Sequence, residues 1–423
     1  MLASVRGARR LAGEVWLPGD KSISHRALIL NGVAAGEASV RGLSDGADVA
    51  STAACLRALG VEVEGSRGSR VRGVGLEGLR PPPGPLDCGN SGTTMRLLAG
   101  LLAGQSFRTT LVGDESLSQR PMERVAQPLR MMGATVETAP LRVGGASRLK
   151  AIEHVSQVAS AQVKSALLLA GLYADGETRV TEPAQSRNHT ELMLEAMGAP
   201  VLVDGLTVSI RRTARLRPLD VTVPGDLSAA AFWLVAAGLH RSAQLRLQAV
   251  GVNPTRSALL DVLGGIGVPI QLTNERLEGC ERVADLEVGS AAELRALTVE
   301  GAAAASLIDE LPVLAVAACL LPGVSRITGA GELRVKESDR VAAMAMGLSA
   351  MGADVTDLAD GWEIKGPRPL EGARVDSRGD HRVAMALAVA GTLADGTTEI
   401  EGAESVGISY PGFWDALDRL CST

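Results

Sequence analysis

Short helices that end in a glycine and lead into a β-branched strand recur along the chain. The pattern is seen in ALGVEV, MMGATV, AMGAPV, GIGVPI and AMGADV, whose glycines are Gly60, Gly133, Gly198, Gly267 and Gly352. Successive glycines are 73, 65, 69 and 85 residues apart. Because glycine readily takes the left-handed conformation that ends a helix, each is predicted to be a helix C-terminus.

A second series of apolar helices begins with a similar period. Their first segments are GDKSISHRALIL, GNSGTTMRLLAGLL, ASAQVKSALLLAGL, GDLSAAAFWLVAAG, IDELPVLAVAACLL and GDHRVAMALAVAG, which start near residues 21, 91, 160, 227, 309 and 381. Within one period the pattern predicts a helix, a strand, a second helix and two strands, as in the run from ASVRG through DVASTAACLRALG and VEVEG to RVRGVG. Six such units predict an α/β protein with mixed sheets, the alternative being chance similarity among helices rich in alanine, glycine and leucine.

Two of the units share a strand–turn–helix signature that predicts the domain boundaries. LPGDKS spans residues 17–22 and VPGDLS spans residues 223–228. A chain of 423 residues is too long for one core, and these segments are predicted to be equivalent crossings between two domains. The predicted domains are residues 1–18 plus 227–423 and residues 19–226, with three units in each.

Composition narrows the classes of function. The formal net charge is −6 and aromatic residues make up only 2% of the chain, so neither nucleic acid nor an anionic membrane is an expected partner. The five cysteines are scattered without a metal-like spacing and are expected to be reduced. No signal peptide or membrane span is expected, which makes the cytoplasm the predicted location. No P-loop, HExxH or compact set of metal ligands occurs, so a metal is not expected.

Cationic and hydroxyl side chains collect at the predicted helix entrances, meaning the first helical turn and the residues just before it. Backbone N–H groups at such an entrance already favour an anion. Arg120 precedes Pro121, a residue favoured at the first helical position, so Arg120 is predicted to project from a helix entrance rather than from the side of a helix. In RVKESDR, the spacing predicts Lys336, Glu337 and Arg340 on one helix face. The remaining candidates are Lys21, Ser22, Arg26, Asn90, Ser91, Gly92, Thr93, Ser160, Gln162, Lys164, Arg187, His381 and Arg382.

These features also have purely structural interpretations. Ser22, Ser24 and Asn90 are typical N-cap residues, and Glu337 with Arg340 is typical of a solvated helix pair. A lone histidine is more often structural than catalytic. However, cations at so many equivalent entrances would repel one another unless anions lay between them. The number of cations predicts at least two anionic groups, and therefore small phosphorylated or carboxylated ligands.

The motifs PGDKSISHRALIL, DCGNSGTTMRLLAG, QRPMERV, SAQVKSALLLAG, RVKESDR and GDHRVAMALAVA, spread over residues 12–420, resemble those of the 5-enolpyruvylshikimate-3-phosphate synthase family. The resemblance implies a two-domain inside-out α/β barrel, each domain holding three βαβαββ repeats around a pseudo-threefold axis. It implies transfer of the enolpyruvyl group of phosphoenolpyruvate to the 5-hydroxyl of shikimate 3-phosphate, with release of phosphate, in aromatic amino-acid biosynthesis. No cofactor is implied, the two small molecules are the expected partners, and a monomer is expected.

The resemblance also assigns roles to residues. Lys21 would contact both substrates, Asp309 would act as base towards the attacking hydroxyl, Glu337 would protonate the methylene carbon, and His381 would support proton transfer or orient the site. The residues matched to shikimate 3-phosphate are Lys21, Ser22, Arg26, Ser160, Ala161, Gln162, Arg187, Asp309 and Lys336. Those matched to phosphoenolpyruvate are Lys21, Asn90, Gly92, Thr93, Arg120, Gln162, Arg340 and Arg382.

Two positions depart from the family pattern, and two other functions stay open. Many members carry a lysine where this chain has Ile408 or Ser409, and some carry serine at Ala161. Gly92 leaves room for the family's inhibitor glyphosate, so sensitivity is expected. The alternatives are a UDP-N-acetylglucosamine enolpyruvyl transferase, whose loop cysteine is missing from GDESLSQRPMERV, and an inert anion-binding protein of the same fold.

Overall fold

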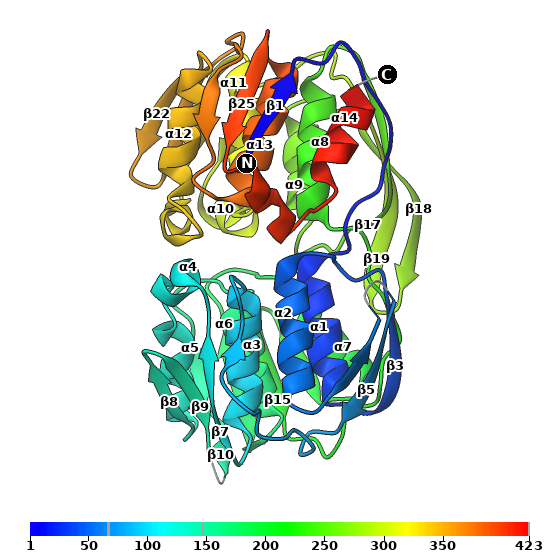
Figure 1. The fold of residues 1–423 in the computed structure, drawn as a ribbon, viewed down its shortest axis with the longest axis vertical. Helices are drawn as coiled ribbons and strands as arrows, with labels where there is room; N and C mark the ends of the chain where they lie inside the picture. Colours follow the sequence, from blue (N-terminus) through cyan, green and yellow to red (C-terminus); the bar gives the residue numbers. More distant parts are fainter. Residues whose placement is uncertain (66–67, 146–147, 422–423) are drawn as a thin grey trace. The chain divides into compact units, whose positions relative to one another are not determined.

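A computed structural model describes residues 1–65, 68–145 and 148–421. The chain forms two compact units. Unit 1 comprises Met1–Pro18, Pro224–Leu277 and Arg282–Thr423, and unit 2 comprises Gly19–Val223 and Glu278–Glu281 (Figure 1). Within the described ranges, no helix has both the length and the apolar character needed to cross a membrane.

Unit 2 contains three four-stranded sheets of the same topology. In each, a parallel pair is extended by two antiparallel strands. Their strand orders are β16 (Val221–Thr222), β3 (Ala35–Arg41), β5 (Gly68–Val74), β4 (Glu62–Glu64); β6 (Leu86–Asp87), β7 (Arg108–Val112), β9 (Leu141–Gly144), β8 (Thr135–Thr138); and β11 (Glu153–Val155), β13 (Glu177–Thr181), β15 (Thr207–Arg211), β14 (Val201–Asp204). A short parallel pair joins β10 (Leu149–Lys150) to β12 (Ala174–Asp175). The helices are α1 (Lys21–Gly32), α2 (Ala47–Ala58), α3 (Gly92–Ala103), α4 (Glu115–Gln119), α5 (Glu123–Met131), α6 (Ala161–Gly171) and α7 (His189–Ala196).

In the described residues, unit 1 also contains three sheets, two of them four-stranded and one three-stranded. Its sheets have the orders β2 (Leu11–Val15), β17 (Ala243–Gly251), β19 (Glu281–Gly289), β18 (Ile270–Glu278); β20 (Thr298–Val299), β21 (Gly323–Ile327), β23 (Gly361–Gly366), β22 (Asp354–Leu358); and β24 (Arg374–Asp376), β25 (Thr397–Glu401), β1 (Leu2–Arg6). Its α-helices are α8 (Leu227–Leu239), α9 (Ala258–Gly265), α10 (Gly301–Ser306), α11 (Leu311–Leu320), α12 (Arg340–Ala350), α13 (His381–Leu393) and α14 (Phe413–Cys421). Two 3₁₀ helices, η1 (Gly331–Val335) and η2 (Ala403–Ile408), complete it.

Two strands belong to a different unit from the helix that follows them. Strand β2 precedes α1 of unit 2, yet it pairs in parallel with β17 of unit 1, from Leu11 opposite Ala243 to Val15 opposite Leu247. Strand β16 precedes α8 of unit 1, yet it pairs in parallel with β3 of unit 2 through Val221 and Val40. The first helix of each unit therefore begins where the chain enters that unit.

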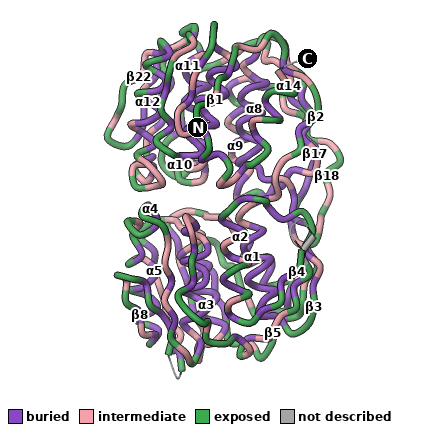
Figure 2. The backbone as a smooth tube through the Cα atoms, viewed as in Figure 1, coloured by how far each residue is buried: buried purple, intermediate pink, exposed green. Residues whose placement is uncertain are grey.

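The first helix of each repeat forms the core of its unit. In unit 1, α8, α11 and α13 pack on one another, and in unit 2, α3 packs on α1 and α6. These helices are buried along nearly their whole length, as the purple segments of Figure 2 show. Because such a helix exposes little except its ends, polar side chains collect at its N-terminal entrance.

The predicted helix C-termini agree with the structure, whereas the start of one core helix is shifted. The φ angles of Gly60, Gly133, Gly198, Gly267 and Gly352 are 91°, 95°, 86°, 101° and 89°, which confirms the five predicted left-handed C-termini. The helix expected near residue 309 begins at Leu311, with Glu310 as its N-cap, and Asp309 lies in the preceding turn. Pro312 fits the first turn of the helix, where a backbone N–H has no intrahelical partner.

Candidate active site

The entrances of α1, α3 and α6 in unit 2 are each capped by a side chain. Asp20 accepts the N–H of Ile23 at 2.9 Å, Ser91 caps α3, and Ser160 caps α6. Ser22 and Asn90, which could have been the caps, are therefore available for other contacts.

The Lys21 ammonium lies at the first turn of α1 beside a carboxylate from α2. Its Nζ is 3.0 Å from Oδ2 of Asp48, and the lysine side chain is 20% exposed. On the same turn, the Ser22 hydroxyl accepts a hydrogen bond from Nη1 of Arg187 at 3.3 Å. Arg187 directly precedes the N-cap of α7, Asn188, as the sequence predicts. These contacts bring Lys21, Ser22 and Arg187 together.

Arg26 is buried beneath this entrance. Its guanidinium donates to Oγ1 of Thr190 at 2.6 Å, to Oγ of Ser165 at 2.8 Å and to the carbonyl of Ser22 at 2.9 Å. Burial lowers the pKa of Arg26 to about 10, with Glu191 opposing the shift. In this structure, Arg26 therefore holds the backbone of Ser22 through a hydrogen bond to its carbonyl oxygen.

Asn90 and Arg120 form a second cluster at the entrance of α3. Arg120 donates through Nη2 to Oδ1 of Asn90 at 2.7 Å, and Asn90 donates to Oδ2 of Asp114 at 2.7 Å. The local prediction for Arg120 was wrong, because Pro121 does not begin a helix. Arg120 is instead the C-cap of the short helix α4, and α5 begins after Met122.

The entrances of α3 and α6 meet through Gln162. Its amide nitrogen donates to Oγ1 of Thr93 at 2.9 Å, and its oxygen accepts from Nη1 of Arg96 at 2.6 Å. A Cβ on Gly92 would lie 2.8 Å from Nη1 of Arg96 and 3.4 Å from Nη1 of Arg120. The absence of a side chain at Gly92 thus leaves room for both guanidiniums. Ala161 is the first residue of α6, beside these groups.

Lys164 does not belong to the candidate site. It is almost fully buried, and its Nζ lies 2.8 Å from a carboxylate oxygen of Glu182 and 2.8 Å from one of Glu191. Glu182 also accepts the N–H of Ser160 at 2.8 Å. The lysine is therefore neutralised inside the protein and needs no bound anion, contrary to the expectation from its position on α6.

In unit 1, Arg340 gathers three carboxylates around one guanidinium. Its Nε is 2.8 Å from Oδ2 of Asp380, its Nη2 is 2.6 Å from Oε2 of Glu337, and its Nη1 is 3.7 Å from Oδ1 of Asp309. Burial opposes the charge on Arg340, but the three carboxylates raise its pKa above the usual value. Burial likewise opposes ionisation of Asp380, yet Arg340 lowers the pKa of that carboxyl overall.

The entrance of α13 completes the unit 1 cluster. Arg382 donates from Nη1 to the carbonyl of Asp309 at 2.9 Å, and its Nε is 3.6 Å from Oδ1 of the same residue. His381, the first residue of the helix, is 2% exposed. Burial lowers the pKa of Lys336, with Asp309 opposing the shift. Asp309 and Glu337 keep side chains that are 17% exposed.

The segment RVKESDR does not form the single helix face that its spacing predicts. Lys336 directly follows η1, and α12 begins only at Arg340. Asp339 caps α12 by accepting the N–H of Ala342 at 3.0 Å, so the local hydrogen bond of a capping residue replaces an earlier helical turn. Glu337 still reaches Arg340, but it does so from a turn.

Sequence reasoning missed several supporting residues, among them Asp48, Arg96 and Asp380. Asp380 had a local signal, because Gly-Asp precedes the first helical residue in GDKS, GDLS and GDHR alike. Asp48 and Arg96 gave no comparable signal, since their partners come from other helices. Near the C-terminus, where many family members carry a lysine, Ile408 ends η2 and Ser409 is its C-cap. Within residues 1–65, 68–145 and 148–421, no group of three or more His, Cys, Asp or Glu side chains could hold a metal ion.

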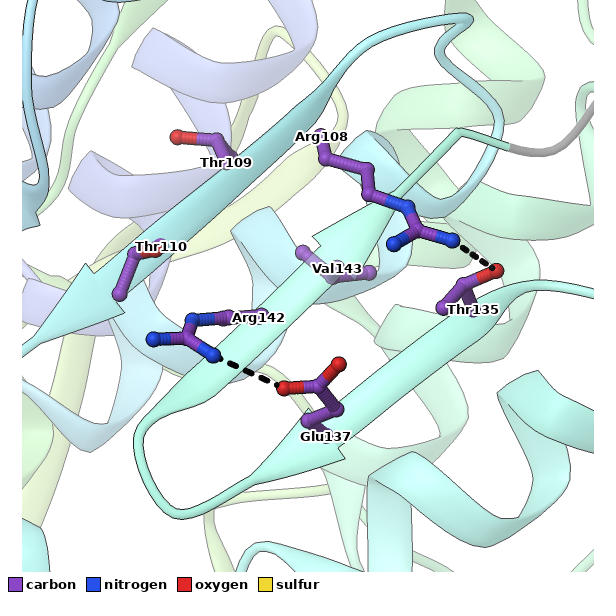
Figure 3. Close-up of a pocket in the computed structure, with 7 residues that line it drawn as sticks. All are labelled: Arg108, Thr109, Thr110, Thr135, Glu137, Arg142 and Val143. Atoms are coloured by element: carbon purple, nitrogen blue, oxygen red, sulfur yellow. Dashed lines mark hydrogen bonds and ion pairs between the residues drawn. The ribbon is translucent and has the colours of Figure 1, made fainter.

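A pocket of about 90 Å³ lies elsewhere, on the sheet that contains β7, β8 and β9 (Figure 3). Its lining residues are Arg108, Thr109, Thr110, Thr135, Glu137, Arg142 and Val143. Arg142 is paired with Glu137 at 3.1 Å and Arg108 bonds Thr135 at 3.3 Å. The pocket contains none of the predicted site residues.

Comparison with known proteins identifies the family. Residues 5–417 match the family model described as EPSP synthase (3-phosphoshikimate 1-carboxyvinyltransferase). The chain belongs to the EPSP synthase family. A 3-phosphoshikimate 1-carboxyvinyltransferase of Gloeobacter violaceus is 54% identical, over 99% of this chain and 98% of that protein. The predicted family and its activity are confirmed.

Solved structures give the same assignment of fold. EPSP synthase from Acinetobacter baumannii superposes with a TM-score of 0.89 and 40% identity, covering 99% of this chain and 98% of that one. The enolpyruvyl transferase NikO from Streptomyces tendae has a TM-score of 0.81 at 18% identity, over 99% and 97% of the two chains, and supports the fold alone. The mixed α/β fold of the family is therefore confirmed, while the predicted cytoplasmic location and monomeric state stay predictions.

Proposed function

We propose that the helix-entrance residues of the two units bind the substrates of the EPSP synthase reaction and carry its proton transfers. The activity is that of a 3-phosphoshikimate 1-carboxyvinyltransferase in the shikimate pathway. In the addition step, the 5-hydroxyl oxygen of shikimate 3-phosphate bonds to C2 of phosphoenolpyruvate while C3 gains a proton. In the elimination step, the C2–O bond to phosphate breaks and C3 loses a proton.

In unit 2, the entrances of α1, α6 and α7 supply groups for shikimate 3-phosphate. We assign this substrate to Lys21, Ser22, Arg26, Ser160, Ala161, Gln162 and Arg187. Three of these are brought together by the Arg187–Ser22 hydrogen bond and the position of Lys21 on the same turn. Ammonium, guanidinium and hydroxyl donors at a helix entrance suit a phosphate ester, because the helix N–H groups add to their field.

The α3 entrance and Arg120 supply groups for phosphoenolpyruvate. We assign Asn90, Gly92, Thr93, Arg120 and Gln162 to it, together with Lys21. Arg120 is already held by Asn90, so its guanidinium is oriented before any ligand binds. An arginine fork suits a carboxylate or phosphate bidentately, and prior orientation lowers the entropic cost of binding.

In unit 1, one observation carries the catalytic proposal: Asp309 and Glu337 contact the same Arg340 guanidinium. We assign Asp309 as the base that takes the 5-hydroxyl proton and Glu337 as the acid that gives a proton to C3. Arg340 holds the two carboxylates in place and, with Arg382, also binds phosphoenolpyruvate. Lys336 assists binding of shikimate 3-phosphate. His381 orients the entrance of α13 or supports proton transfer.

The finer description of the fold is also a proposal. We propose that residues 1–18 with 227–423, and residues 19–226, are the two domains, each an inside-out barrel of three βαβαββ repeats around a pseudo-threefold axis. The three sheets of each unit and the strand exchange of β2 and β16 support it.

Steady-state kinetics of a Lys21→Met variant test the site. Phosphate release by the native protein should require both substrates, and Lys21→Met should reduce it at least about a thousandfold, because the ammonium stabilises charge on both ligands. Lys150→Met, at an exposed lysine of β10, is the matched control and should retain full activity. Unfolding midpoints of the two variants should match that of the native protein. Near-normal turnover by a folded Lys21→Met protein would refute the site assignment.

A further inference from the structure

Helices α1 and α2 are joined by two side-chain contacts, one turn apart. Lys21 and His25 lie four residues apart on α1, and Asp48 and Thr52 lie four apart on α2. The first contact is the ion pair between Lys21 and Asp48 at 3.0 Å. The second is a hydrogen bond of 2.7 Å between Nδ1 of His25 and Oγ1 of Thr52. The proposed function uses Lys21 of the first contact and leaves the second contact unexplained.

The second contact continues into α3 as a chain of hydroxyl groups. Oγ1 of Thr52 lies 2.6 Å from Oγ1 of Thr94, and Thr94 donates to Oγ of Ser91 at 2.7 Å. Ser91 also accepts the backbone N–H of Thr94 at 3.1 Å, which makes it the N-cap of α3. The chain therefore ends on the residue between Asn90 and Gly92, inside the candidate phosphoenolpyruvate site.

The hydrogen bonds of this chain run in one direction. Since Thr94 donates its hydroxyl proton to Ser91, it accepts from Thr52, and Thr52 in turn accepts from Nδ1–H of His25. Burial lowers the pKa of His25 to about 3, so the imidazole is neutral. All four side chains are fully shielded from solvent. Because these groups are buried, each donor depends on acceptors inside the protein. Thr94 has a second, longer one, since its Oγ1 also lies 3.4 Å from the carbonyl oxygen of Asp48.

We propose that His25, Thr52 and Thr94 are positioning residues that hold the entrance of α3 at a fixed place relative to Lys21. The inference rests on the proposed function, which assigns Asn90, Gly92 and Thr93 to phosphoenolpyruvate. None of the three positioning residues is among those assigned to a substrate. They act through Ser91, the N-cap of α3, which fixes the direction of the first N–H groups of that helix. Misplacement of such a group by about 1 Å can cost up to about a hundredfold in rate.

The test compares two buried threonines replaced by valine, which has the same shape but no hydroxyl. Thr52→Val breaks the chain, whereas Thr178→Val, in β13, removes a buried hydroxyl that has no hydrogen-bond partner within the described residues. Thr52→Val should raise the KM for phosphoenolpyruvate about tenfold and change the KM for shikimate 3-phosphate less than about twofold. Thr178→Val should change neither. Thr52→Ser restores a hydroxyl and should recover most of the native KM.

A double variant tests whether the chain acts as a unit. Thr94→Val breaks the next link, so it should reproduce the effect of Thr52→Val, and the two together should be no worse than either alone. Thr94→Val also serves if Thr52→Val does not fold. Absence of turnover by the native protein would refute the proposed function itself. Native turnover with no change in the KM for phosphoenolpyruvate in folded Thr52→Val or Thr94→Val, or an equal rise for both substrates, would overturn the positioning role.

Discussion

At the scale of single residues, Gly92 shows how a missing side chain shapes the candidate site. A methyl group there would lie 2.8 Å from Nη1 of Arg96, so the guanidinium must move, and it would also press on Arg120. Gly92→Ala should therefore raise the KM for phosphoenolpyruvate roughly tenfold, because an arginine binds its ligand well only when its guanidinium is correctly placed. The KM for shikimate 3-phosphate should change little. Steady-state kinetics with each substrate varied in turn measure both.

A second glycine provides the control for this prediction. A Cβ added at Gly264 would meet no atom within 4 Å, and this glycine lies at the exposed end of α9. Gly264→Ala should leave both KM values unchanged. Equal KM values for Gly92→Ala and Gly264→Ala would show that the placement of Arg96 and Arg120 does not depend on Gly92.

Asp380 links the stability of unit 1 to pH. Its folded-state pKa is lowered by Arg340, so it contributes stability above its unfolded value of about 3.9 and loses that contribution as pH falls towards the folded value. Asp380→Asn should lower the free energy of unfolding by about 3–5 kcal/mol at pH 7, because it leaves a buried guanidinium short of a partner. The difference from the native protein should shrink below about pH 4. Urea unfolding at pH 7 and pH 3 measures it.

An exposed aspartate separates this effect from a general loss of charge. Asp376 is paired with Arg378 at 3.1 Å, and its side chain is 47% exposed. Asp376→Asn should change the free energy of unfolding by no more than about 0.5 kcal/mol at either pH. A pH-independent loss in Asp380→Asn would contradict the assigned ion pair.

At the scale of elements, the glycines that end the helices make a prediction about conformation alone. Gly352 has a φ of 89°, and an added Cβ would meet its nearest atom only at 3.7 Å. Gly352→Ala should therefore destabilise the protein by about 1–2 kcal/mol through left-handed strain, without a clash. Gly264→Ala, in the last turn of α9, should instead stabilise the protein by about 0.5–1 kcal/mol. Urea unfolding measures the change in the free energy of unfolding for each variant. Changes of opposite sign in Gly352→Ala and Gly264→Ala would support this argument, and changes of the same sign would contradict it.

The same elements show how far the sequence predicts the site. Helix ends were predictable because a glycine or a capping aspartate acts on its own neighbours, as at Gly352 and Asp380. Lys164 was assigned wrongly because its two carboxylate partners come from another strand end and another helix, which no local pattern shows. The start of α12 was wrong because Asp339 caps it, although Lys336 and Arg340 have helical spacing. Local hydrogen bonds are readable from sequence, whereas charge pairing across elements depends on the fold.

At the scale of the whole molecule, each unit contains a strand from the chain segment that leads into the other unit. Leu11 of β2 is buried in the core of unit 1, although α1 of unit 2 follows ten residues later. Val221 of β16 is buried in the core of unit 2, although α8 of unit 1 follows six residues later. At both segments, β2 to α1 and β16 to α8, the strand therefore belongs to a different unit from the helix that follows it.

This disagreement can be tested by hydrogen exchange with paired core substitutions. Leu11→Ala should cost about 2–5 kcal/mol and speed amide exchange in β17 and α8, because β2 pairs with β17 and β17 packs on α8. Val221→Ala should act on β3 and α1 instead, since β16 pairs with β3 and α1 packs on β3. Mass spectrometry of peptides covering these four elements reads both effects. If Leu11→Ala loosened α1 and β3 rather than β17 and α8, β2 would belong with the helix that follows it in sequence, and the strand exchange would be wrong.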